Sequence, residues 1–95
     1  MEEATPDLPF TVYVLRSKRC QDSIYIGVTE NLRRRLREHN SDINQSYTKR
    51  YAPWEIENCI LFGDKQKAET FEHYLKTHSG RVFLRKRLLQ ERPAK

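Results

Sequence analysis

The sequence has few of the features that mark membrane, secreted or metal-cluster proteins. Its longest uninterrupted apolar runs, such as Cys59–Phe62 ("CILF"), are too short to cross a bilayer. The opening "MEEATPDLPF" lacks the basic segment and apolar stretch of a secretory signal. Cys20 and Cys59 show neither CxxC spacing nor paired histidines, which favours two reduced thiols over a disulfide or a zinc site. We therefore expect a cytoplasmic protein with no membrane partner.

Several catalytic signatures are also missing. The sequence has no Ser-His-Asp arrangement and no HExxH pair, and its three glycines form no phosphate-cradling loop. His73 and His78 lack metal-ligand spacing and are expected on the surface. These absences disfavour nucleotide-dependent and zinc-dependent chemistry, and we expect no small-molecule cofactor.

What the sequence does contain is charge, with basic residues in excess. Of the 95 residues 37% are hydrophobic and 33% are charged, which suits one small domain with a modest core. The 18 lysines and arginines exceed the 13 acidic residues and give a net charge of +5. This balance favours a polyanionic partner, although many small basic domains bind none.

The order of the segments predicts an α+β fold, namely a small three-stranded antiparallel sheet flanked by helices in the order β-β-α-β-α-α. β-Branched and aromatic runs predict strands at 10–17, 23–29 and 54–63. Helices are expected at 30–40, 65–78 and 81–89, with a polar loop at 41–53 and a break at Gly80. The domain is expected to span 9–90, between a flexible leader (1–8) and a flexible tail (91–95).

Alternation along the strands predicts where the aromatic residues lie. If the aliphatic residues of the first two strands pair on one face, Tyr13 and Tyr25 emerge together on the other. In the third strand the same alternation places four apolar side chains on one face: Trp54, Ile56, Ile60 and Phe62.

The first predicted helix, "ENLRRRLREHN", carries a row of polar residues. Thr29 or Asn31 is the expected N-cap. Asn31, Arg35 and His39 are spaced i, i+4, i+8 and therefore stack on one side of the helix. The long Arg35 side chain can return toward the tyrosines, where its planar fork of donors would suit a phosphate. The alternative is an ordinary solvated basic helix.

A carboxylate borders the buried stripe of the second long helix. Ala68, Phe71 and Leu75 mark that stripe, and Glu72 lies at its edge. A carboxylate in this position is costly unless it is paired or binds a cation. Pairing with an arginine and coordination of a metal ion are the two outcomes considered.

At these residues the chain resembles the GIY-YIG nuclease family, from about Thr11 to Leu88. The resemblance rests on "VYV", "YIG", "NLRRRLREHN", "AETFEHYLK" and "SGRVFLRKRL" in this order. It implies a hydrolase that cuts DNA phosphodiesters with one divalent ion, Mg²⁺ or Mn²⁺. The implied catalytic residues are Tyr13, Tyr25, Arg35, His39 and Glu72, with Glu72 as the metal ligand and Gly27 in a structural role. Tyr13, Tyr25 and His39 all stay open as the general base.

Three functional hypotheses follow. The first is a metal-dependent endonuclease, nicking or structure-directed, in DNA repair or recombination, with a partner protein or a dimer as an option for targeting. The alternative is a non-catalytic nucleic-acid-binding module that keeps the fold, with Tyr47 or Tyr51 stacking on bases. The third is a protein-interaction domain whose charge keeps it soluble. In the first two, phosphates would be bound by Arg33, Arg34, Arg37, Lys49, Arg50 and Arg81.

Overall fold

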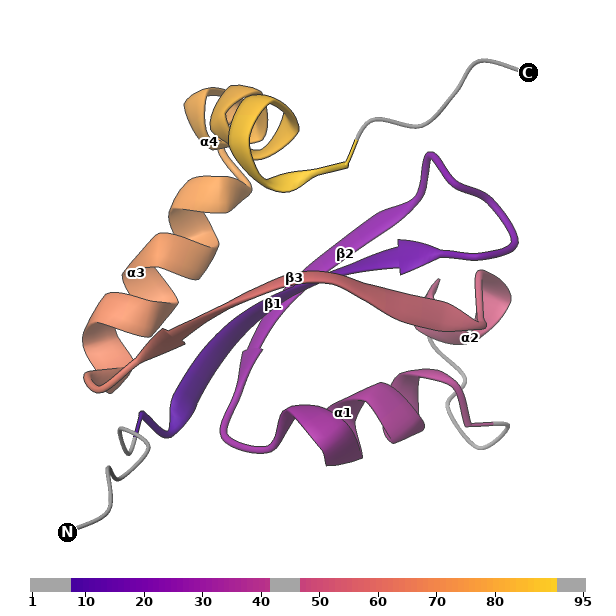
Figure 1. Ribbon diagram of the computed structural model, residues 1–95, viewed down its shortest axis with the longest axis horizontal. Helices are drawn as coiled ribbons and strands as arrows, with labels where there is room; N and C mark the ends of the chain where they lie inside the picture. Colours follow the sequence, from indigo (N-terminus) through magenta and orange to yellow (C-terminus); the bar gives the residue numbers. More distant parts are fainter. Residues whose placement is uncertain (1–7, 42–46, 91–95) are drawn as a thin grey trace, which may run out of the picture.

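An antiparallel sheet with the order β2-β1-β3 forms the centre of the molecule (Figure 1). The computed structural model describes residues 8–41 and 47–90, so most of the predicted leader (1–8) and all of the predicted tail (91–95) lie outside the described residues. β1 (Phe10–Ser17) pairs with both β2 (Ile24–Thr29) and β3 (Trp54–Phe62). The predicted α+β class and three-stranded antiparallel sheet are confirmed.

Helices cover both faces of this sheet. They are α1 (Leu32–His39), the short α2 (Tyr47–Arg50), α3 (Lys65–Leu75), α4 (His78–Phe83) and the π-helical turn η1 (Leu84–Leu88). α1 and α3 lie on opposite sides of the sheet (Figure 1). Within the described residues, none of these helices has the length and apolar character needed to cross a membrane.

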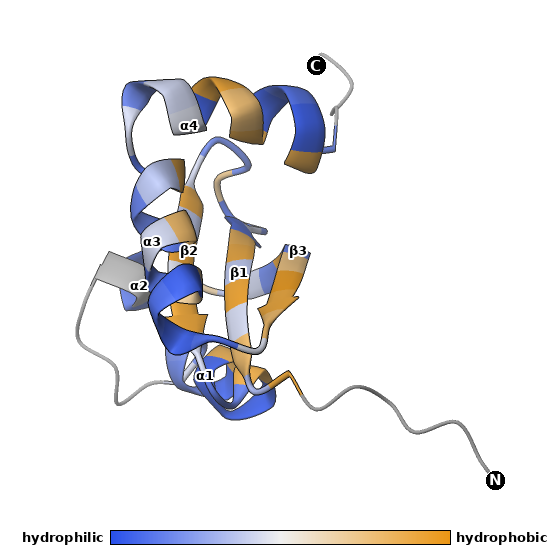
Figure 2. Ribbon diagram, turned by 90° about the vertical axis from the view of Figure 1, so that its left-hand side faces the viewer, coloured by the Kyte–Doolittle hydropathy of each residue, from blue (hydrophilic) through white to orange (hydrophobic). Residues whose placement is uncertain are grey.

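The strand register separates two cores. Val12 pairs with Val28 and Val14 with Ile26, so the aliphatic residues share the face covered by α3 and α4, where the buried cluster includes Ala68, Leu75 and Leu84. The opposite face carries Tyr13, Leu15 and Trp54, with Leu32, Leu36 and Tyr25 packed against them. The prediction that both tyrosines emerge on one face is confirmed. Figure 2 shows that the strands are largely apolar whereas α1 is mostly hydrophilic.

A β-bulge overturns the predicted face of the third strand. Val14 pairs with Asn58 but Leu15 pairs with Ile56, which leaves Glu57 as an extra residue in β3. An extra residue reverses the alternation of side chains beyond it. Trp54 therefore packs with Tyr13 and Leu15, whereas Phe62 packs on the aliphatic face. The prediction that Trp54, Ile56, Ile60 and Phe62 share one face was wrong.

The bulged carboxylate joins the sheet to the C-terminal segment. Arg16 donates to Glu57 through Nε at 3.1 Å and through Nη2 at 3.2 Å. The Gln90 N–H also donates to Glu57 Oε2, and Arg16 Nη1 donates to the Gln21 carbonyl at 2.7 Å. Because a charge out of contact with water must be paired to be tolerated, these mutual bonds hold both buried side chains in place.

The helices differ from the predictions in two respects. The polar loop at 41–53 contains α2, although residues 42–46 within it lie outside the described part of the chain. Gly80 does not break a helix but lies buried inside α4. The break falls at Lys76 and Thr77, because the Thr77 hydroxyl caps α4 by accepting from the Gly80 N–H at 3.1 Å.

Gly80 is required by close backbone packing at this corner. A Cβ added there would overlap the Tyr74 carbonyl oxygen and lie 2.7 Å from Leu75 Cα, and neither backbone atom can move away easily. We predict that Gly80→Ala lowers the free energy of unfolding by about 3 kcal/mol, the upper range for overpacking, in urea titrations followed by circular dichroism. Gly63→Ala is the matched control, because its new Cβ would meet only a flexible Leu8 methyl at 3.3 Å. An equal loss in both variants would contradict the packing argument.

Candidate active site

The candidate site is organised by the Tyr13 ring, which lies across Gly27. The two residues face one another in the β1–β2 register, and β2 is an edge strand. A Cβ on Gly27 would lie 2.5 Å from Tyr13 Oη and 2.7 Å from its Cζ. Only glycine leaves room for this ring, which therefore extends across β2 toward the edge of the sheet.

Three rings gather on this face. Tyr13 Oη and His39 Nε2 are hydrogen-bonded at 3.0 Å, and both residues are buried. The Tyr25 ring centroid lies 4.5 Å from that of His39 and 6.1 Å from that of Tyr13. The half-buried Tyr25 is the more accessible of the two tyrosines. The structure thus brings together all three candidates for the general base.

Both ends of α1 are fixed, which sets the position of His39. Asn31 caps the start of the helix by accepting from the Arg34 N–H at 3.0 Å, so of the two expected caps Asn31 holds this place. Asn40 follows the helix and forms two bonds with the Trp54 backbone: its Oδ1 accepts from N–H at 2.7 Å, and its Nδ2 donates to C=O at 3.3 Å. The sequence interpretation treated Asn40 only as a helix end and missed this role.

Burial keeps the Tyr13–His39 pair neutral. It lowers the pKa of His39 from 6.5 to about 4, with the Arg35 charge acting in the same direction and Glu38 opposing it. Burial also raises the pKa of Tyr13 above its ordinary value, although Arg35 counteracts part of this effect. At neutral pH the phenol keeps its proton and the imidazole has a free lone pair. Within the described residues His39 Nδ1 has no hydrogen-bond partner.

Arg35 reaches the tyrosine face, as its helical position predicts. Its guanidinium charge acts directly on the pKa of Tyr13, and its side chain is 35% exposed. Nη1 donates to Glu38 Oε1 at 2.7 Å, and this bond raises the pKa of Arg35 further above its ordinary value. A permanent cation with several donors thus lies near the phenol and is partly open to solvent.

Glu72 approaches from α3, on the other face of the sheet. The residue is 7% exposed, and its charge raises the pKa of Tyr13, so the carboxylate lies within electrostatic reach of the phenol. Its partner is not the expected arginine: Lys76 Nζ lies 2.6 Å from Oε2. Lysine takes this position because it is one helical turn further on the same helix.

The donor set around Glu72 fits one particular kind of metal ion. Among the described residues no group of three or more His, Cys, Asp or Glu side chains could surround a cation. A single buried carboxylate with an accessible flank suits Mg²⁺, which prefers hard oxygen ligands and keeps most of its waters. It does not suit Zn²⁺, which requires three or four protein ligands.

The predicted phosphate-binding residues are exposed but do not form one surface. Arg33, Arg34 and Arg37 lie on α1, with Arg34 Nε 3.6 Å from Glu38 Oε2. Lys49 and Arg50 are exposed on α2, whereas Arg81 is exposed on α4, across the sheet from α1. Tyr51 packs against the core cluster of Tyr13, Leu15 and Trp54, and the Tyr47 side chain lies outside the described residues.

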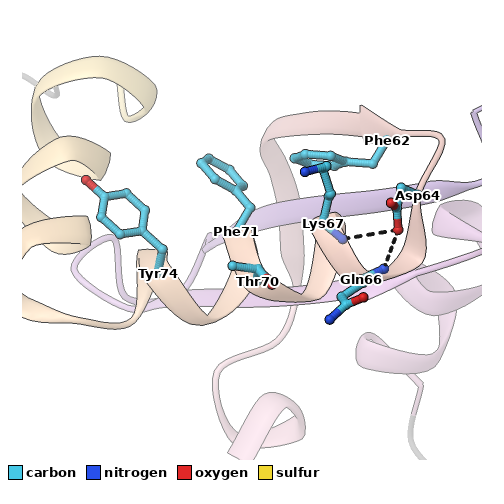
Figure 3. Close-up of a pocket in the computed structure, with 7 residues that line it drawn as sticks. All are labelled: Phe62, Asp64, Gln66, Lys67, Thr70, Phe71 and Tyr74. Atoms are coloured by element: carbon cyan, nitrogen blue, oxygen red, sulfur yellow. Dashed lines mark hydrogen bonds between the residues drawn. The ribbon is translucent and has the colours of Figure 1, made fainter.

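An aromatic hollow of about 590 Å³ lies apart from these groups, between β3 and α3 (Figure 3). The two bonds drawn there are those that Asp64 accepts from the Gln66 and Lys67 N–H groups as the N-cap of α3. None of the predicted site residues lines this hollow, whose residues are Phe62, Asp64, Gln66, Lys67, Thr70, Phe71 and Tyr74.

The lowered pKa of His39 predicts a specific acid sensitivity. Because the unfolded chain takes up this proton near pH 6.5 and the folded chain only near pH 4, stability falls as the pH drops through that window. The loss attributable to His39 is at most about 3 kcal/mol. His39→Gln should remove this component, so its free energy of unfolding should depend less on pH between 7 and 4 in urea titrations. His78→Gln, which removes an exposed histidine, is the control; equal slopes in all three proteins would contradict the assignment.

Comparisons with known proteins identify the family of the chain. A sequence model of the GIY-YIG catalytic domain matches residues 9–87. A UPF0213 protein of Clostridium perfringens is 34% identical over 65 residues, which cover 68% of this chain and 68% of that protein. The structure-specific endonuclease subunit slx1 of Schizosaccharomyces pombe is 39% identical over 67 residues (66% of this chain, 24% of the relative). The structure-specific endonuclease subunit SLX1 of Debaryomyces hansenii is 40% identical over 77 residues (74% of this chain, 22% of the relative).

The chain therefore spans about two thirds of its bacterial relative but less than a quarter of these two endonuclease subunits. The matched region contains β1, β2, α1, β3 and α3, which carry every group of the candidate site. With most of its length matched by that domain, the chain belongs to the GIY-YIG family.

Proposed function

We propose that this chain, an endonuclease of the GIY-YIG family, hydrolyses DNA phosphodiester bonds with Tyr13, Tyr25, Arg35, His39 and Glu72, and with one Mg²⁺ or Mn²⁺ ion at Glu72. The observation that carries the proposal is the convergence on one phenol. Tyr13 is hydrogen-bonded to His39, and its pKa responds to both Arg35 and Glu72. These groups come from β1, α1 and α3, so only the folded chain brings them together.

The Tyr13–His39 pair supplies a path for the proton of the attacking water. As the water oxygen attacks phosphorus, the bond from phosphorus to the leaving oxygen breaks, and that oxygen takes a proton from solvent. Tyr13 Oη takes one proton of the attacking water and passes its own to His39 Nε2, 3.0 Å away. The free site disfavours the imidazolium, because burial lowers the pKa of His39. A bound phosphate anion raises that pKa again, since an opposite charge favours the protonated form. A bound substrate thus makes the proton transfer to His39 less unfavourable than it is in the free site.

Arg35 stabilises the charge that develops on the phosphate. Glu38 engages Nη1 and fixes the orientation of the guanidinium, while the remaining N–H donors can engage two phosphate oxygens. The side chain is partly exposed, so a backbone phosphate can approach it without unfolding the site. Its positive charge matters most in the transition state, where negative charge on the phosphoryl oxygens and the leaving oxygen increases.

Glu72 would hold the divalent ion through its buried carboxylate. When bound, such an ion would neutralise charge on the scissile phosphate and the leaving oxygen. α3 packs against β1 and β2, and the Glu72 carboxylate lies within electrostatic reach of Tyr13.

The names of the relatives support a structure-directed substrate. Two of them are called structure-specific endonuclease subunits. We therefore propose nicking at branched or otherwise distorted DNA, in repair or recombination, with a partner protein or a second copy directing the enzyme. The exposed arginines of α1 and the basic residues of α2 would contact the phosphates beside the cut.

Loss of the metal ligand should separate cutting from binding. We predict that Glu72→Gln abolishes Mg²⁺-dependent cleavage of a panel of duplex, branched and single-stranded DNA, while DNA affinity at 100 mM salt changes less than about threefold, since the phosphate contacts remain. Glu69→Gln is the matched control, because Glu69 is exposed on the same helix. Cleavage that survives in Glu72→Gln would contradict the metal role. If the unmodified chain cuts none of these DNAs, the hypothesis of a non-catalytic nucleic-acid-binding module is favoured instead.

Replacing the guanidinium should slow the chemical step. In Arg35→Lys the charge stays but the planar fork is lost, so we predict a fall of about 10²-fold in the single-turnover cleavage rate. Arg85→Lys makes the same chemical change at an exposed arginine of η1 that has no proposed role, and it should leave the rate within about twofold. Rates measured at saturating enzyme distinguish this effect from weaker DNA binding; equal rates in the two variants would remove Arg35 from the mechanism.

A further inference from the structure

The carboxylate of Glu72 already contacts two side chains near the C-terminal end of α3. Lys76 Nζ lies 2.6 Å from Oε2, and His73 Nε2 lies 3.6 Å from Oε1. The Glu72 side chain is 9% exposed, whereas that of Lys76 is 50% exposed. A nearly buried anion is thus neutralised by an ammonium group that enters from solvent.

This pair differs from an ordinary surface ion pair. Arg34 and Glu38 on α1 have the same i, i+4 spacing, but both side chains are about half exposed, and such pairs contribute little to stability. Glu72 is largely out of contact with the water that would solvate an exposed carboxylate, so a neighbouring cation must compensate its charge. Lys76 meets that requirement at the group to which the proposed function assigns the metal.

We propose that Lys76 is an internal counter-cation that competes with the divalent ion for Glu72, so that metal binding requires Lys76 to leave. This inference rests on the metal role proposed for Glu72. An ammonium group in contact with Oε2 and a divalent ion on the same carboxylate repel each other, which excludes simultaneous occupancy. The long, flexible and half-exposed lysine side chain can swing into water at low cost.

The arrangement gives the lysine two opposite effects. Without metal, the contact with Lys76 balances the charge of Glu72 and restrains its side chain within electrostatic reach of Tyr13, so the site is preformed. With metal, the same contact must be broken, which lowers the apparent affinity for the ion. Lys76 therefore sets the concentration of divalent ion at which the enzyme becomes active.

Direct measurement of metal binding tests this competition. Bound Mn²⁺ is followed by the loss of the free-ion electron paramagnetic resonance signal, with the full chain and no DNA. Lys76→Met and Lys76→Gln should bind Mn²⁺ about fivefold more tightly than the unmodified chain, the upper range for a half-exposed ion pair. Lys76→Arg, which keeps the cation, should bind within about twofold of the unmodified chain. Circular dichroism shows whether Lys76→Met and Lys76→Gln are folded, and one folded variant of the two is enough for the test.

Two controls separate the possible failures. Lys67→Met removes the same charge from an exposed position of α3, so a gain equal to that of Lys76→Met would show a general charge effect and overturn the proposal. Unchanged affinity in Lys76→Met, with binding still lost in Glu72→Gln, also overturns it but leaves the metal role of Glu72 standing. Binding that persists in Glu72→Gln overturns both the competition and the metal role.

Discussion

The candidate site depends on the passage of the Tyr13 ring over Gly27. The missing side chain at Gly27 lets a phenol from the central strand lie across the edge strand β2. There it meets His39 from α1, and it comes within electrostatic reach of Arg35 and of Glu72 from α3. Any residue with a Cβ at this position would displace the Tyr13 ring. His39, Arg35 and Glu72 would then no longer share the phenol as a neighbour.

This arrangement explains how one sheet joins groups from both of its faces. α1 and α3 pack on opposite sides, and a side chain at the centre of the sheet would contact only one of them (Figure 1). α3 packs against β2, the edge strand that the Tyr13 ring crosses. In the proposed function the basic residues of α1 and the carboxylate of α3 act on one phosphate, and none of them lines the aromatic hollow near Phe62.

Much of this could be predicted from the sequence because it depends on local periodicity. Strand alternation placed Tyr13 and Tyr25 on one face, and helical spacing placed Arg35 and His39 on the side of α1 near the tyrosines. Helical spacing also singled out Glu72 at the edge of a buried stripe. The resemblance to the GIY-YIG family, which the family match confirms, implied a metal-binding role for it. Features that depend on pairing between distant segments could not be predicted, among them the bulge at Glu57 and the contact of Gly80 with the Tyr74 carbonyl. The ion pair between Lys76 and Glu72 could have been predicted from their i, i+4 spacing. It was missed because an arginine was expected as the partner of Glu72.

The bulge in β3 has a consequence for α1. Because Glu57 reverses the alternation, one end of the strand turns Trp54 toward the tyrosines and the other end turns Phe62 toward α3. Trp54 is also where Asn40 anchors the last turn of α1, which carries His39. The length of β3 is therefore fixed. Deleting one of its residues would turn the side chains at one end of the strand to the opposite face of the sheet. His39 would then lose the support of the bonds between Asn40 and Trp54, although no residue of the candidate site had been changed.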